Sequence, residues 1–123
     1  MARVLVVDDE PTVRHLLRFM LERGGHRVEE AGDGLEGVRL FRQQPFDLVV
    51  TDIFMPGQEG LETIRELRRD YPGVKIIAVT GGDMAMGADN ALKFARVLGA
   101  VRVMKKPWDR DEFLGAAEEA LKG

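Results

Sequence analysis

Five short runs of apolar and β-branched residues, each followed by a stretch with helical spacing, most constrain the fold of this chain. The runs are RVLVV from Arg3, HRVEEA from His26, FDLVVT from Phe46, KIIAVT from Lys75 and VRVM from Val101. After each run, apolar residues recur at the three- and four-residue spacing of an amphipathic helix. This alternation predicts parallel strands that are joined by helical crossovers.

The expected helices have apolar faces and recognisable ends. Pro11 suits a first helical turn, and Asp109 with Glu112 forms a capping-box pattern before the last helix. A glycine pair at 24–25 ends the first helix, and Pro72 lies beyond the third. We expect these positions to face inward, helix by helix: Val13, Leu16, Leu17, Met20 and Leu21; Leu35, Val38 and Phe41; Leu61, Ile64 and Leu67; Leu92, Ala95 and Leu98; Phe113, Ala117 and Leu121.

The polarity of the runs indicates where each strand lies in the sheet. The runs from Arg3, Phe46 and Lys75 are continuously apolar, as parallel strands covered on both faces require. The run from His26 is more polar and suits an edge. The sequence therefore predicts one α/β domain over residues 1–123. It is an open, doubly wound, five-stranded parallel sheet in the flavodoxin-like order 2-1-3-4-5, with helices on both faces.

Composition excludes several classes of site. The 123 residues can bury a core without disulfides, and the absence of cysteine excludes a thiolate metal site and a cysteine nucleophile. A net charge of −3, with no helix-turn-helix or finger pattern, argues against direct nucleic-acid binding. The apolar start is short and runs at once into two aspartates, so it is neither a signal peptide nor a membrane span. We expect a cytoplasmic protein that does not bind membranes.

Polar residues follow the predicted strands at the ends where a doubly wound sheet binds ligands. Asp8 and Asp9 follow the first run, Asp52 the third, Thr80 the fourth and Lys106 the fifth. In the order 2-1-3-4-5 the three carboxylates converge where the winding reverses. Like charges so close together favour a hard divalent cation, and Mg²⁺ is the natural candidate.

The same residues suit phosphoryl chemistry. Asp52 is a candidate Mg²⁺ ligand, a nucleophile, or both in turn, since a carboxylate that attacks a phosphoryl donor forms an acyl phosphate. Lys106 could neutralise phosphoryl oxygens and Thr80 could donate a hydrogen bond to one. Taken singly, each residue has an ordinary explanation: solvated acids, a turn former, a strand threonine and a surface lysine. Their placement on one rim favours a shared site.

Four segments, VLVVDDEP, DLVVTDIFMPGQEGLE, IIAVTGG and LGAVRVMKKPWD, resemble the receiver domain of two-component response regulators nearly end to end. The resemblance implies that Asp52 accepts the phosphoryl group and that Asp8 and Asp9 hold Mg²⁺. It also implies that the Thr80 hydroxyl turns toward the phosphoryl group, with Lys106 as the cationic partner.

Further features implied by the resemblance involve the neighbours of these residues. The main-chain carbonyl of Phe54 would be a Mg²⁺ ligand, and the peptide before Pro107 would be cis. Val103 departs from the family, which usually has Tyr or Phe there as a ring that follows the threonine inward. The Phe54 side chain either shields an acyl phosphate from water or is a rim aromatic. The segment 81–90 is longer than is typical and is either a site of conformational change or a simple connector.

The expected function is a phosphorylation-dependent switch. The resemblance implies a histidine kinase, a histidine phosphotransfer protein or a small phosphodonor as the donor. It also implies control of a downstream protein or fused output domain, as a monomer or a phosphorylation-dependent homodimer. Only self-phosphorylation and self-dephosphorylation are expected, so the chain is not predicted to be an enzyme. Two alternatives are a degenerate receiver that acts only as an interaction module and a small aspartyl-phosphate phosphohydrolase. The second would need an Asp-x-Asp motif, which VVDDEP lacks.

Overall fold

Strands and helices alternate along the chain in the computed structural model, which describes residues 2–53, 60–80, 93, 95–105 and 109–122. Residues 93 and 95–98 are helical and precede the last strand. Leu92, in the fourth predicted helix, lies outside the described residues. The labelled elements are β1 (Arg3–Val7), α1 (Pro11–Arg23), β2 (Arg27–Ala31), α2 (Gly34–Gln43), β3 (Leu48–Asp52), α3 (Gly60–Asp70), β4 (Ile76–Thr80), β5 (Arg102–Lys105) and α5 (Arg110–Lys122).

The five strands form one parallel sheet in the order β2-β1-β3-β4-β5, which confirms the predicted fold. The more polar strand β2 lies at an edge, as predicted. In the register of the central strands, Val7 of β1 lies opposite Thr51 of β3, and Asp52 lies opposite Val79 of β4. The carboxyl ends of β1, β3 and β4 therefore meet at the same edge.

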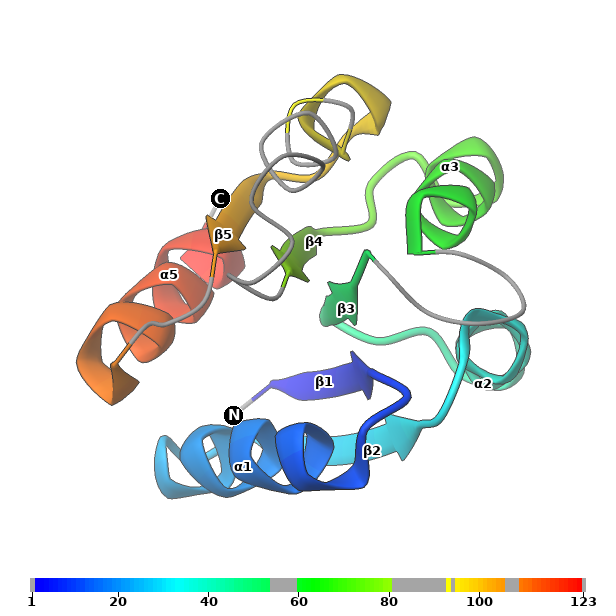
Figure 1. The fold of residues 1–123 in the computed structure, drawn as a ribbon. Coiled ribbons are helices and arrows are strands. Elements are labelled where there is room, and N and C mark those ends of the chain that lie inside the picture. The colour runs from blue at the N-terminus through cyan, green and yellow to red at the C-terminus, as the bar shows by residue number, and fades with distance from the viewer. Residues whose placement is uncertain (1, 54–59, 81–92, 94, 106–108, 123) are drawn as a thin grey trace.

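Helices cover both faces of the sheet, with α1 and α5 on one side and α2 and α3 on the other (Figure 1). Alternate strand residues point to the two sides because successive side chains in a strand face opposite ways. Val4 and Val6 pack in the cluster that includes Leu17 of α1 and Phe113 of α5. Leu5 packs in the cluster with residues of α2 and α3 on the other face. Burying each such side chain contributes about 1.5–3 kcal/mol.

Two predicted inward positions are wrong. Leu16 in α1 and Leu35 in α2 are 56% and 64% exposed. The buried stripe of α2 consists of Gly34, Gly37, Val38 and Phe41, which share one helical face. Leu35 lies one residue off this stripe, and glycines give no hydrophobic signal by which to find it. A Cβ on Gly37 would lie 2.9 Å from a methyl group of Val7, so α2 approaches the sheet through glycine.

The helix starts follow ordinary capping chemistry. Asp33 accepts a hydrogen bond from the backbone N–H of Glu36, and Asp109 accepts one from Glu112. The first helix begins at Pro11, as predicted. Among the described helices, none is long and apolar enough to cross a bilayer.

Candidate functional site

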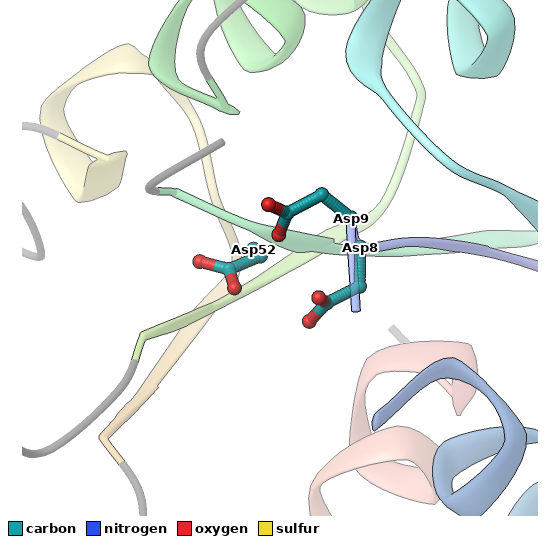
Figure 2. A group of neighbouring side chains, drawn as sticks. All are labelled: Asp8, Asp9 and Asp52. Atoms are coloured by element: carbon teal, nitrogen blue, oxygen red, sulfur yellow. The ribbon is translucent and has the colours of Figure 1, made fainter. Parts of the chain in front are cut away.

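Three aspartate side chains come together at the carboxyl edge of the two central strands. Asp8 and Asp9 directly follow β1, and Asp52 is the last residue of the neighbouring strand β3. One carboxylate oxygen from each residue lies within 4.8 Å of the others. Figure 2 shows the three side chains gathered beside these two strand ends. Asp8 and Asp52 are buried, whereas Asp9 is exposed, so the cluster opens to solvent on one side.

Hydrogen bonds hold the turn that carries Asp8. Its N–H donates to the Ala31 carbonyl at 3.1 Å, which continues the pairing of β1 with β2. Its Oδ1 accepts a hydrogen bond from the N–H of Glu10 at 2.9 Å. Its carbonyl oxygen accepts one from Nη1 of Arg14 at 2.7 Å. Backbone and side chain of Asp8 are thus fixed where the chain turns from β1 into α1.

Asp52 is positioned by its strand and by a glycine at the start of α3. The Ile53 N–H donates to the Val79 carbonyl at 3.0 Å, which carries the β3–β4 pairing past Asp52. The Gly60 N–H donates to the Ile53 carbonyl at 3.1 Å, so α3 begins directly against the end of β3. A Cβ on Gly60 would overlap with the carbonyl oxygen of Asp52 and lie 2.5 Å from Cα of Ile53. Only glycine fits this approach without a shift of the backbone.

The carboxylate set fits a hard, oxygen-ligated cation. Oxygens around Mg²⁺ lie about 2.0–2.1 Å from the metal, so adjacent ligands are about 3 Å apart and opposite ligands about 4 Å apart. The three oxygens, already within 4.8 Å of one another, need only small movements to reach these spacings. Two unit charges about 4 Å apart repel by about 4 kcal/mol at an effective dielectric of about 20. A divalent cation would relieve that repulsion.

The remaining predicted site residues lie on or beyond the neighbouring strands. Thr80 is the last residue of β4 and lies one place beyond Val79, the partner of Asp52. Val103 lies in β5 opposite Ala78, is half-buried, and packs against the core on the α2 and α3 side. Phe54, Lys106, Pro107 and the segment 81–90 lie outside the described residues.

A partly buried carboxylate on β2, Glu30, is linked to the cluster through Arg14. Burial raises the pKa of Glu30, but hydrogen bonds from Arg18 and Arg14 lower it more, so the Glu30 pKa is below its ordinary value. Glu30 is therefore an anion at neutral pH, held by two arginines. Sequence reasoning missed Arg14, Glu30 and Gly60. The available signals were an acid in the polar edge strand β2, basic residues one turn apart on α1, and a glycine beginning a helix.

Comparisons with known proteins give the family. The model of the response regulator receiver domain matches residues 4–118. Protein PilH of Pseudomonas aeruginosa is 37% identical over 125 residues, which cover the whole of both chains. A protein-glutamate methylesterase/protein-glutamine glutaminase of Hahella chejuensis is 39% identical over 105 residues, which cover 85% of this chain and 30% of that protein.

A solved structure is similar over nearly the whole chain. The CheY-like response regulator receiver domain protein from Methanospirillum hungatei superposes with a TM-score of 0.90 at 30% identity and covers 99% of this chain and 94% of its own. The strand order, the acidic edge and these matches agree with one another. The chain belongs to the response regulator receiver domain family of two-component systems.

Proposed function

We propose that this chain is a phosphorylation-dependent switch that accepts one phosphoryl group on a carboxylate oxygen of Asp52. The observation that carries the proposal is the convergence of Asp8, Asp9 and Asp52 at the carboxyl edge of a receiver-domain sheet. Asp52 is the last residue of a central strand that pairs with β1 on one side and β4 on the other, so the strand holds its carboxylate in a rigid position. Rigid placement of a nucleophile lowers the entropic part of the barrier.

In the proposed reaction, an oxygen of Asp52 attacks the phosphorus atom of the donor. The new bond is P–O, and the broken bond is P–N when the donor is phosphohistidine or P–O when it is acetyl phosphate. The leaving group is imidazole, which takes up a proton, or acetate. Thr80 would donate a hydrogen bond to a phosphoryl oxygen, and Lys106 would supply positive charge there.

The residues that would hold Mg²⁺ are Asp8, Asp9 and Asp52, with the main-chain carbonyl of Phe54. The chemistry that bound Mg²⁺ supplies is neutralisation of the negative charge on the phosphoryl oxygens. The burial of Asp52, which is 6% exposed, limits the access of water to the acyl phosphate. Val103 offers no ring to follow Thr80, so the signal would be transmitted by repacking of an aliphatic side chain against the core.

We further propose that residues 1–123 act as one cytoplasmic receiver domain. A histidine kinase or histidine phosphotransfer protein would be the donor, and a downstream protein or fused output domain would be the target. The relative from Hahella chejuensis supports a fused output domain, because the match covers only 30% of that protein and its name refers to an enzymatic activity. We propose a monomer or a homodimer that forms on phosphorylation.

Intact mass spectrometry after incubation with acetyl phosphate tests the proposal. We expect one phosphoryl adduct that requires Mg²⁺ and is absent from Asp52→Asn. Asp111→Asn is the matched control, because that carboxylate is on α5 with its side chain 91% exposed, and it should be phosphorylated like the unmodified chain. No adduct under any condition would favour a degenerate interaction module. Rapid release of inorganic phosphate from an external phosphate ester, with no phosphoryl adduct that accumulates, would favour a phosphohydrolase.

A further inference from the structure

Arg14 connects the acidic edge to a second group of charged residues. Its Nη1 donates to the main-chain oxygen of Asp8 at 2.7 Å, and its Nε donates to Oε1 of Glu30 at 3.1 Å. The Arg14 side chain is only 18% exposed. A Cβ on Gly32 would lie 3.6 Å from Nη1 of Arg14, so the chain after β2 packs close to this group. One guanidinium therefore bridges β2 and the turn that carries the candidate Mg²⁺ ligands.

Glu30 fixes the direction of that guanidinium. Its Oε2 accepts a hydrogen bond from Nη1 of Arg18 at 3.1 Å, and its Oε1 accepts one from Nε of Arg14. The Glu30 side chain is 14% exposed and comes from a strand residue that pairs with Val6 of β1. Because Oε1 of Glu30 holds Nε of Arg14, the planar guanidinium is oriented so that its Nη1 reaches the main-chain oxygen of Asp8.

The oxygen that Arg14 contacts belongs to the peptide group between Asp8 and Asp9. A peptide group is planar, so fixing its oxygen also fixes the direction of the N–H and Cα of the next residue. The Asp8 N–H and carboxylate are already held by Ala31 and Glu10. The bond from Arg14 therefore determines how Asp9, the exposed member of the cluster, is presented toward Asp52.

We propose that Arg14 is a positioning residue for the Mg²⁺ site and that Glu30 acts through it. This inference rests on the proposed function. The charges within this group balance, because Glu30 pairs with Arg14 and Glu22 pairs with Arg18. The effect is therefore geometric: Arg14 and Glu30 orient the peptide between the two ligands Asp8 and Asp9. Groups that orient metal ligands commonly affect metal affinity by about 10–100-fold.

Isothermal titration calorimetry with Mg²⁺ tests this inference. We expect Arg14→Met to raise the Mg²⁺ Kd at least about tenfold. Arg18→Met is the matched control, because Arg18 is on the same helix and also binds Glu30, but its hydrogen bonds go to Glu22 and Glu30 rather than to Asp8. We expect its Mg²⁺ Kd to change less than about twofold, since Arg18 is 44% exposed and an exposed ion pair contributes little to stability.

Phosphorylation by acetyl phosphate at increasing Mg²⁺ gives a second readout. In Arg14→Met, the half-saturating Mg²⁺ concentration should rise while the rate at saturation stays close to that of the unmodified chain. A variant that was merely less folded would instead lose rate at every Mg²⁺ concentration. Arg14→Lys covers the case in which Arg14→Met does not fold; with one donor group instead of a fork, it should also bind Mg²⁺ more weakly.

Two results overturn the inference alone: an Arg14→Met Kd within about twofold of the unmodified chain, or equal weakening in Arg14→Met and Arg18→Met. Absence of Mg²⁺ binding by the unmodified chain would instead overturn the proposed function and this inference with it. The calorimetry of the unmodified chain therefore separates the two failures.

Discussion

A Cβ atom on Gly60 would overlap with the Asp52 carbonyl oxygen, and this contact is with backbone that cannot easily move. We expect Gly60→Ala to lower the free energy of unfolding by about 1–3 kcal/mol, the usual cost of forcing extra atoms into a packed region. Because the strain falls on the residue that is proposed to be phosphorylated, we also expect slower phosphorylation by acetyl phosphate. Urea denaturation measures the first effect, and mass spectrometry over time measures the second.

Gly115→Ala is the matched control for Gly60→Ala. Gly115 lies within α5, and a Cβ there would meet nothing within 4 Å. Alanine is favoured over glycine inside a helix by about 0.5–1 kcal/mol, so this variant should be slightly more stable than the unmodified chain. A Gly60→Ala variant as stable as Gly115→Ala would contradict the close approach of α3 to β3.

Single residues also show what the sequence could and could not predict at the site. Asp8, Asp9 and Asp52 were predicted to converge because strand ends in a parallel sheet meet at one edge, and the structure brings them together. Arg14 and Glu30 were not predicted, because which strand residue faces which helix residue depends on the register of β2 against β1. Such contacts arise from tertiary packing and have no local spacing signal.

Glu30 joins edge strand β2 to helix α1. It accepts hydrogen bonds from Arg14 and Arg18 and lies 3.5 Å from Nε2 of His15. These bonds lower the pKa of Glu30 despite the opposing effect of burial. A carboxyl whose pKa is lower in the folded state stabilises the fold above its unfolded pKa, about 4.3, and this stabilisation is lost as pH falls through the folded value.

We therefore expect Glu30→Gln to be less stable than the unmodified chain by about 1–2 kcal/mol at pH 7, since hydrogen bonds to a charged group are lost. The difference should shrink as the pH falls below about 4.3, where the unfolded chain begins to bind the proton, and should be lost once the pH has fallen below the lower pKa of folded Glu30. Urea denaturation of both chains from pH 7 to pH 3 measures this. Glu29→Gln is the control, because its ion pair with Arg3 is half-exposed and should contribute less. A difference that stayed constant with pH would contradict the assignment.

The order of the strands and helices was predicted better than the helix faces that are buried. Strand order followed from hydrophobic runs, because a parallel sheet covered on both sides leaves few topologies. The face of α2 was partly missed because Gly34 and Gly37 are buried where the helix lies close to the sheet. Leu16 lies at the margin of the α1 stripe, so its spacing fits the pattern although it is 56% exposed. Apolar periodicity identifies a helix more reliably than it identifies the width of the buried face.

The acidic site exists only when the sheet is formed. Asp9 and Asp52 are 43 residues apart in sequence numbering and meet because β1 and β3 pair along four registered positions. The unfolded chain cannot gather these carboxylates, so a cation that binds them binds the folded state alone. Binding of this kind stabilises the entire domain by mass action.

Mg²⁺ should therefore raise the melting temperature of the unmodified chain. At a free concentration about ten times the Kd, the stabilisation is about 1.4 kcal/mol, which corresponds to several degrees for a domain of this size. Asp52→Asn should melt at a higher temperature than the unmodified chain without Mg²⁺, because one repelling charge is removed, and should show a smaller rise with Mg²⁺. Differential scanning fluorimetry at constant ionic strength measures both, with Asp111→Asn as the control for loss of a carboxylate far from the cluster. If Asp52→Asn melts no higher than the unmodified chain without Mg²⁺, the three carboxylates do not repel one another as the geometry indicates.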